Sequence, residues 1–265
     1  MTFEVVPGTV YVVGAGPGAL DLITIRGRAL IEAADLVVLA DSLVDPAHGA
    51  AAKPGARVVG SSTLTLEEIT GQMIEAARRG EVVVRVHSGD PSVYGALHEQ
   101  LVALRAGGVP VEVVPGVNSA LAAAAALGVE LTVPDVAQTV ILTRAEGRAS
   151  KVPDAESLRS LAAHGATLAL FLSANLIEDA VGQLIEGGYA PETPAAIAYR
   201  VSWPDEQLIR CALGDVVASM RQAGIGRTAV VLVGAALGDD AAVEAARSRL
   251  YDPAYGHRYR AAGEA

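Results

Sequence analysis

The sequence predicts an α/β protein of two domains, with a ligand-binding cleft between them and a mixed second sheet. Short β-branched runs alternate with helical periodicity along most of the 265 residues. A proline-containing connector at residues 129–136 interrupts this alternation, and polar glycine-rich loops follow several strands. Open α/β sheets bind ligands at the carboxyl ends of their strands, and inter-domain clefts are favoured sites. We expect domains over residues 1–117 and 118–240, then a tail over 241–265.

The composition narrows the possible functions. The net charge of -10 argues against a nucleic-acid partner, because phosphate binding needs clustered Lys and Arg. Cys211 is the single cysteine, and no CxxC or HExxH spacing occurs, so we expect no metal. Residues 1–7 do not read as a signal peptide, and the longest apolar stretch, 120–129, is too short to span a bilayer. A cytoplasmic protein with no membrane partner is expected.

In the first domain, strands and helices alternate at the spacing of parallel βαβ units. Thr24 is a suitable N-cap for its first helix, because its hydroxyl can accept a hydrogen bond from a free backbone amide. We expect strands at 9–13, 35–40, 57–60, 82–87 and 110–114, and helices at 25–34, 65–79, 118–127 and along the Val93, Leu97, Leu101 and Leu104 repeat.

In the second domain, two neighbouring strands around Trp203-Pro204-Asp205 are predicted to form a hairpin. A hairpin is antiparallel, so this sheet is expected to be mixed. We expect its strands at 139–143, 167–172, 195–199, 207–211 and 229–233, and its helices at 155–163, 176–186 and 215–223.

The loop Gly89-Asp90-Pro91 follows a buried strand and is the first candidate site. Asp90 would either bind a ligand or form an Asx turn with its own backbone, and the sequence favours neither. His87 ends the strand, where a histidine is more often structural than catalytic. We therefore expect a ligand near this loop without assigning chemistry to His87.

The segment Gly14-Ala15-Gly16-Pro17-Gly18-Ala19 matches GxGxxA, and Asp41 ends the next strand, as in a dinucleotide site. Pro17 removes an amide that a phosphate cradle would use. The glycines could instead let two elements pack closely. A nucleotide-dependent oxidoreductase using NAD(P) is therefore one alternative function.

Three arginines lie where strands of the second domain end, namely Arg144, Arg148 and Arg200. An exposed, solvated loop would explain them without a ligand. Guanidinium groups also bind carboxylates in a bidentate manner. The arginines are thus candidates for holding an anionic substrate in an acidic protein.

Four ordered motifs resemble the class III S-adenosylmethionine-dependent tetrapyrrole methyltransferases. They are Val12 to Gly18, Ala34 to Val38, Ser88 to Pro91 and Val114 to Val117. Further segments at 41–44, 85–95, 139–148 and 203–206 look like the branch that methylates C11 of precorrin-4 or its cobalt form. The resemblance implies the tetrapyrrole methylase fold, a homodimer, S-adenosylmethionine as donor, S-adenosylhomocysteine as product and a tetrapyrrole substrate.

The resemblance also implies site residues. In the family, the glycine-rich loop lines the substrate trough and its proline lies near the donor. The positions that match donor contacts are Pro17, Ser88, Gly89, Asp90, Val93, Tyr94, Asn118, Ser119, Leu172, Tyr199, Thr228 and Ala229. The tetrapyrrole carries many carboxylates, which gives Arg144, Arg148 and Arg200 a role in binding it. Glu99 matches a family glutamate near the substrate.

One position departs from the family pattern. Relatives that methylate uroporphyrinogen pair an aspartate matching Asp41 with a lysine, and Ser61 stands at the lysine position here. Asp41 is the candidate general base, but the acid–base pair does not carry over. Methylation at another position or of another precursor (precorrin-2, precorrin-3 or uroporphyrinogen III) and a non-enzymatic tetrapyrrole carrier remain alternatives.

Overall fold

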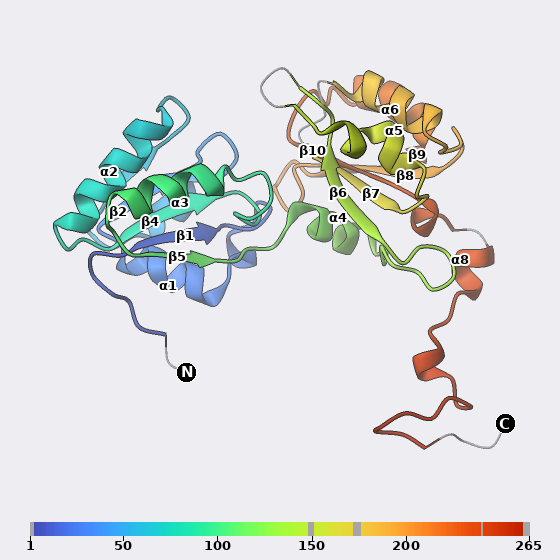
Figure 1. Ribbon diagram of the computed structural model, residues 1–265, viewed down its shortest axis with the longest axis horizontal. Helices are drawn as coiled ribbons and strands as arrows, with labels where there is room; N and C mark the ends of the chain where they lie inside the picture. The colour runs from blue at the N-terminus through green and yellow to red at the C-terminus, as the bar shows by residue number, and fades with distance from the viewer. Residues whose placement is uncertain (1–2, 148–150, 172–175, 240, 262–265) are drawn as a thin grey trace. The chain divides into compact units, whose positions relative to one another are not determined.

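The computed structural model describes residues 3–147, 151–171, 176–239 and 241–261. The chain forms two compact units, each with its own sheet (Figure 1). The first contains Met1–Ala122 together with Arg200–Glu206, and the second contains Ala123–Tyr199 and Gln207–Ala265. The hairpin tip 200–206 therefore belongs to the first unit, although it lies late in the sequence.

The first unit contains a five-stranded sheet in the order β3-β2-β4-β1-β5, and all its strand pairs are parallel, as predicted. Its central strands are buried along their whole length, which is typical of a sheet covered on both faces. The strands are β1 (Val10–Gly14), β2 (Leu36–Leu39), β3 (Arg57–Gly60), β4 (Val83–His87) and β5 (Val111–Val114).

Helices cover both faces of this sheet: α1 lies on one face, and α2 and α3 lie on the other (Figure 1). Successive side chains of a strand point to opposite faces of the sheet, so they pack into two separate cores. One core contains Tyr11 and Leu30, and the other contains Leu36 and Met73. The helices are α1 (Ile25–Ala33), α2 (Leu66–Arg78), α3 (Leu97–Ala106) and, in the segment shared with the second unit, α4 (Ser119–Leu127), with 3-10 turns η1 (Leu20–Leu22) and η2 (Pro46–Ala51).

Most predicted helix ends agree with the structure, with two exceptions. The helix expected at 155–163 is instead a 3-10 turn at Asp154–Glu156 followed by a short α-helix at Leu158–Ala162. The Thr24 hydroxyl caps α1 by accepting a hydrogen bond from the Gly27 amide, as predicted. The helix expected from Val93 onward begins only at Leu97. Tyr94 and Ala96 have left-handed backbones, with φ of 55° and 49°, which interrupt a right-handed helix. The loop after β4 is therefore longer than the periodicity indicates.

The second unit contains a mixed sheet in the order β6-β7-β10-β8-β9, in which only β6 and β7 pair in parallel. The hairpin predicted around Trp203 is confirmed as β8 and β9. The strands are β6 (Val140–Arg144), β7 (Thr167–Phe171), β8 (Pro194–Tyr199), β9 (Gln207–Ala212) and β10 (Ala229–Val233).

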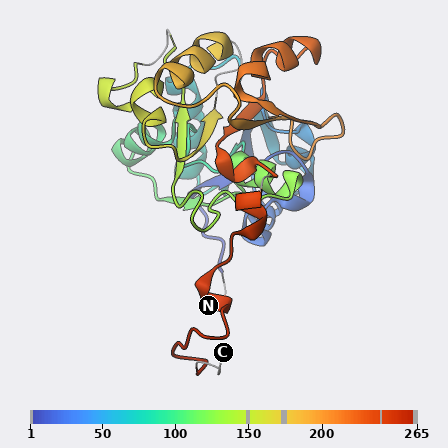
Figure 2. The ribbon, with the colours of Figure 1, turned by 90° about the vertical axis from the view of Figure 1, so that its right-hand side faces the viewer.

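The core of the second unit is aliphatic, with Leu168, Leu184 and Ile197 fully buried. Its helices are α5 (Leu158–Ala162), α6 (Ile177–Glu186) and α7 (Val216–Gln222), with 3-10 turns η3 (Asp154–Glu156), η5 (Leu213–Asp215) and η6 (Ala235–Leu237). The tail contains α8 (Ala241–Ala245) and η7 (Arg249–Tyr251) and is otherwise irregular (Figure 2). Over the described ranges, no helix combines the length and the apolar character needed to cross a membrane.

Candidate functional site

Three loops meet at the carboxyl edge of the parallel sheet, after β1, β4 and β5. Strand β1 lies between β4 and β5 in the sheet. The Gly16 amide donates to the Gly89 carbonyl at 3.2 Å, and the Gly89 amide donates to the Gly16 carbonyl at 2.7 Å. These two hydrogen bonds join the loops after β1 and β4 directly. The candidate loops are therefore joined at the sheet edge where ligands of α/β folds bind.

Glycines allow this convergence because the backbones are nearly in contact. A Cβ atom on Gly116 would lie 2.1 Å from the Gly89 carbonyl oxygen, and one on Gly14 would lie 2.6 Å from the same oxygen. Gly89 itself has φ of 62°, which favours glycine. Close packing, one of the two interpretations of the glycine-rich motif, is therefore a property of this structure.

Asp90 fixes the backbone of two of these loops. One carboxylate oxygen accepts a hydrogen bond from the Ser92 amide at 2.8 Å, which forms the Asx turn considered above. The other accepts from the Gly116 amide at 2.9 Å and so connects the loop after β4 to the loop after β5. Asp90 thus determines the loop geometry, whether or not it also contacts a ligand.

The other predicted donor-binding residues of the first unit lie on these same loops. Ser88, Asn118 and Ser119 are half-buried, and Tyr94 is 43% exposed. The Asn118 side chain accepts a hydrogen bond from the Ala120 amide at 2.8 Å at the start of α4. Half-buried polar side chains on converging loops are suited to a polar small molecule.

Asp41 follows β2 at the same sheet edge and is held by a residue that the sequence did not single out. The Ser62 amide and the Ser62 hydroxyl each donate to the Asp41 carboxylate, both at 2.8 Å. Partial burial raises the pKa of Asp41, but the hydrogen bonds from Ser62 outweigh it and leave the pKa below its ordinary value. Asp41 is exposed and, at neutral pH, ionised, as a proton acceptor must be.

A buried polar network lies behind these loops. The Arg85 guanidinium donates to the Gln100 side chain at 3.2 Å and to the Val38 carbonyl at 3.3 Å, and Gln100 lies 3.4 Å from the His87 ring. Burial lowers the pKa of Arg85 to about 10, although the Asp41 charge raises it. Burial, and then the Arg85 charge, lowers the pKa of His87 to about 4. His87 is thus a buried neutral residue. Glu99, a predicted substrate contact next to Gln100 in the sequence, is exposed.

Arg200 already has partners within the first unit. Its guanidinium forms an ion pair with Asp205 at 2.6 Å and lies 4.3 Å from the centre of the Trp203 ring. A substrate carboxylate would therefore have to compete with Asp205 for this cation.

The second unit brings three of its predicted site residues together. Tyr199 ends β8 and pairs in register with Ala229, the first residue of β10. Thr228 precedes Ala229 and has φ of 57°. Arg144 ends β6 and is half-buried, whereas Arg148 and Leu172 lie outside the described residues.

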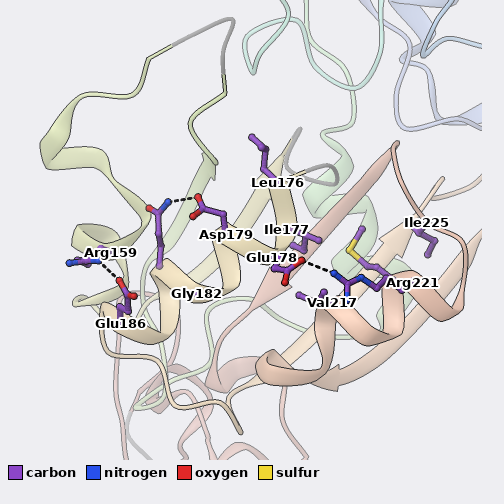
Figure 3. Close-up of a pocket in the computed structure, with 12 residues that line it drawn as sticks. Arg159, Leu176, Ile177, Glu178, Asp179, Gly182, Glu186, Val217, Arg221 and Ile225 are labelled. Carbon is purple, nitrogen blue, oxygen red and sulfur yellow. Dashed lines mark hydrogen bonds and ion pairs between the residues drawn. The ribbon is translucent and has the colours of Figure 1, made fainter.

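The second unit also has a surface pocket of about 930 Å³ between its helices (Figure 3). Two ion pairs cross its lining: Arg221 with Glu178 at 2.6 Å, and Arg159 with Glu186. Its lining residues, on α5, α6, α7 and the turns beside them, include no predicted site residue. Within the described residues, no group of three or more His, Cys, Asp or Glu is arranged to hold a metal ion.

Comparison with known proteins gives consistent results. The model of the family Tetrapyrrole (Corrin/Porphyrin) Methylases matches residues 9–217. A Cobalt-precorrin-4 C(11)-methyltransferase of Priestia megaterium is 48% identical over 94% of this chain and 96% of its own length. The solved structure of a cobalt precorrin-4 methyltransferase of cobalamin biosynthesis is 48% identical, with a TM-score of 0.84 over 87% of this chain and 96% of that one.

A more distant solved structure contains a ligand. It is a uroporphyrin-III C-methyl transferase of Thermus thermophilus, complexed with S-adenyl homocysteine. It is 30% identical to this chain, with a TM-score of 0.68 over 85% of this chain and 92% of that one.

Proposed function

The chain belongs to the tetrapyrrole (corrin/porphyrin) methylases, and on that premise we propose that it methylates C11 of cobalt-precorrin-4 or precorrin-4 in corrin synthesis. S-adenosylmethionine is the methyl donor and S-adenosylhomocysteine the product. The observation that carries the proposal is the similarity to C11-methyltransferases over nearly the whole of both chains. The same residues 85–95 and 139–148 that resemble this branch include the loop after β4 and the end of β6.

We propose that the donor binds at the carboxyl edge of the first sheet; contacts with Tyr199, Thr228 and Ala229 are what the family resemblance implies. The loops after β1, β4 and β5 suit a nucleoside with an amino-acid tail, because half-buried Ser88, Asn118 and Ser119 offer hydrogen-bonding groups. Pro17 is buried in the structure, and its contact with the donor stays a prediction. The expected cleft between the domains and the contacts of Arg148 and Leu172 stay predictions.

The main task of the protein in this reaction is to position the donor and the substrate. The donor supplies an electrophilic methyl on a sulfonium, and a reduced tetrapyrrole supplies an electron-rich carbon. Holding the carbon, methyl and sulfur in line accelerates such a transfer through proximity and orientation. The residues that tie the three loops together, Asp90 and the glycines around it, serve this purpose.

Asp41 is the group proposed to accept the proton that the macrocycle loses or relocates. Its carboxylate is exposed at the sheet edge and oriented by Ser62. The hydrogen bonds that lower its pKa also make it a weak base, so its contribution comes from its position rather than from its strength.

Arginines at the strand ends are proposed to bind the carboxylates of the tetrapyrrole, with Arg144 and Arg148 as the main contacts and Arg200 in competition with Asp205. Glu99 is proposed to lie near the substrate. We further propose a cytoplasmic location and a homodimer; light scattering of the purified protein tests the dimer.

Anaerobic incubation with S-adenosylmethionine and cobalt-precorrin-4 tests the function. Mass spectrometry should show the gain of one methyl group, and NMR should place it at C11. A methyl at another carbon would move the chain to another branch of the family. Tetrapyrrole binding without methyl transfer would favour a carrier, and tight binding of NAD(P) would favour an oxidoreductase.

A further inference from the structure

The tip of the β8–β9 hairpin, residues 200–206, packs on the glycine-rich loop after β1, and this contact has no place in the function proposed so far. We call residues 200–206 the strap. The Trp203 indole N–H donates to the Pro17 carbonyl at 2.9 Å. The Ser202 hydroxyl accepts a hydrogen bond from the Ala19 amide at 2.9 Å. The strap thus binds the main chain of residues 17–19, far away in sequence.

The shape of the loop matches the Trp203 ring closely. A Cβ atom on Gly18 would lie 2.2 Å from the ring. Gly18 does not need a left-handed backbone, since glycines with positive φ do not include it. The requirement for glycine at this position therefore comes from the indole of Trp203 and not from the local backbone.

The two halves of the loop have different supports. Ala15 donates to the His87 carbonyl at 2.7 Å, and Gly16 exchanges two hydrogen bonds with Gly89, so the first half is held by the strand edge and the loop after β4. Pro17 and Ala19 are held by the strap. Removing the strap contacts would release the second half while the first half stays in place.

The strap is itself built as a rigid turn. The Arg200 guanidinium lies over the Trp203 ring and pairs with Asp205. The Ser202 amide donates to the Glu206 carboxylate at 2.6 Å. Arg200 and Ser202 have left-handed backbones, with φ of 45° and 66°, a conformation that costs free energy in residues other than glycine. Internal bonding holds this strained turn in the shape that presents Trp203 to the loop.

We propose that the strap fixes the second half of the glycine-rich loop in its ligand-binding shape, and that Trp203 is the positioning residue through which it sets tetrapyrrole affinity. The inference rests on the proposed function, because it takes the ligand beside this loop to be the tetrapyrrole. The loop lies at the carboxyl edge of β1, joined to the loop after β4. Trp203 acts through Pro17 and Gly18 and need not touch the reacting atoms.

Hydrogen exchange and ligand affinity test the proposal with three variants and a control. Trp203→Ala removes both ring and hydrogen bond, Trp203→Phe keeps a ring, and Gly18→Ala places a methyl group against the indole. Gln207→Ala, exposed and directly after the strap, is the matched control. Amide exchange at Gly18 and Ala19, with Ala15 and Gly16 as the internal reference, tetrapyrrole binding by visible absorption, and donor binding by calorimetry are measured for each.

The expected results differ between the two ligands. Trp203→Ala should speed exchange of the Gly18 and Ala19 amides about tenfold, leave exchange at Ala15 and Gly16 unchanged, and weaken tetrapyrrole binding about tenfold. Donor affinity should fall less, because the loops after β4 and β5 and the first half of the glycine-rich loop stay in place. Trp203→Phe, which should fold normally, is expected to show a smaller loss. Gly18→Ala should be harmful alone and nearly harmless in the Trp203→Ala background, because the clash is then gone.

Other outcomes would contradict the proposed role of the strap or the proposed methyltransferase function, and the two can be distinguished. Unchanged exchange at Gly18 and Ala19, or faster exchange there with unchanged tetrapyrrole affinity, would contradict the positioning role of Trp203. If the wild type binds the tetrapyrrole but transfers no methyl group, the proposed function is wrong. The tetrapyrrole affinities of the variants then still test the proposed role of Trp203. If the wild type binds no tetrapyrrole at all, both proposals fall.

Discussion

The carboxyl edge of the first sheet and the helix-lined pocket of the second unit show two different ways of arranging polar groups. At the sheet edge, glycines, Asp90 and main-chain hydrogen bonds hold three loops together. In the pocket, four of the five charged side chains are well exposed and form two ion pairs (Figure 3). Exposed ion pairs contribute little stability and rearrange easily.

This difference shows why the size of a pocket alone does not identify a site. The sheet edge is preorganised, since replacing a single hydrogen atom with a methyl group on Gly116 would disturb two other loops. Preorganised groups are what a transfer reaction requires, because they lose little freedom when the ligand binds. The pocket between α6 and α7 offers no comparable constraint.

Replacing Asp41 should have the largest effect on turnover. For Asp41→Asn we expect kcat to fall by about 100-fold or more, with the KM values nearly unchanged, because the general base is lost and the shape is kept. Asp45→Asn is the control, since Asp45 caps the nearby turn η2 through the Ala47 amide. Steady-state kinetics under anaerobic conditions measure both. An Asp41→Asn enzyme with normal kcat would show that the reaction needs no base here.

Gly116→Ala should abolish the convergence of the loops. The new methyl group meets the Gly89 carbonyl oxygen, so the loops must separate, and we expect kcat/KM to fall about 100-fold and donor affinity to fall with it. Gly71→Ala is the matched control, because Gly71 lies within α2 and a Cβ there meets nothing within 4 Å. Donor calorimetry on both variants gives the answer. Equal affinities would mean that the convergence of the loops does not build the donor site.

Arg144→Ala extends the comparison to the second unit. We expect the KM for the tetrapyrrole to rise about tenfold and donor affinity to stay the same, because one charge-assisted contact to a carboxylate is lost. Arg159→Ala, in the helix-lined pocket, should leave both unchanged. A larger rise in KM for Arg159→Ala than for Arg144→Ala would indicate that the tetrapyrrole binds in that pocket instead.

The smallest expected effect at neutral pH concerns His87. Burial lowers the pKa of His87 from its ordinary value of 6.5 to about 4 in the folded protein, so between these pH values the unfolded chain binds a proton that the folded one does not. Stability is therefore lost as the pH falls from about 6.5 to about 4, by about 3 kcal/mol in total.

Replacing the histidine tests this pH dependence. His87→Gln should lose less stability than the wild type between pH 7 and pH 4.5, whereas His98→Gln, on the exposed side of α3, should behave like the wild type. Urea unfolding at a series of pH values measures the difference. Parallel curves for the wild type and His87→Gln would contradict a buried neutral imidazole.

Local patterns predicted much of the fold. Alternation of β-branched runs and helical spacing located the strands to within a residue or two, and the cap at Thr24 needed only its side chain and position. The hairpin around Trp203 followed from two adjacent strands. The late start of α3 was missed, because left-handed residues such as Tyr94 have no signature in periodicity.

Site residues that belong to a sequence motif could be predicted, whereas contacts between segments far apart in the sequence could not. Gly89 and Asp90 stand at a strand end, which the sequence shows directly. Ser62 holds Asp41 from 21 positions away, and Trp203 holds Pro17 from 186 positions away. Serine is common in loops, and nothing near Trp203, the single tryptophan of the chain, names Pro17 as its partner. The pairing of β2 with β3 brings Ser62 to Asp41, and the packing of the hairpin tip on the loop after β1 brings Trp203 to Pro17.

A crystal structure with S-adenosylhomocysteine would test the central claim most directly. We predict that the nucleoside contacts the loops after β1, β4 and β5, with Gly89 and Asn118 among its neighbours and with Asp90 still bound to the Gly116 amide. A ligand seated instead between α6 and α7, with those loops empty, would contradict the assignment of the donor to the glycine-rich sheet edge.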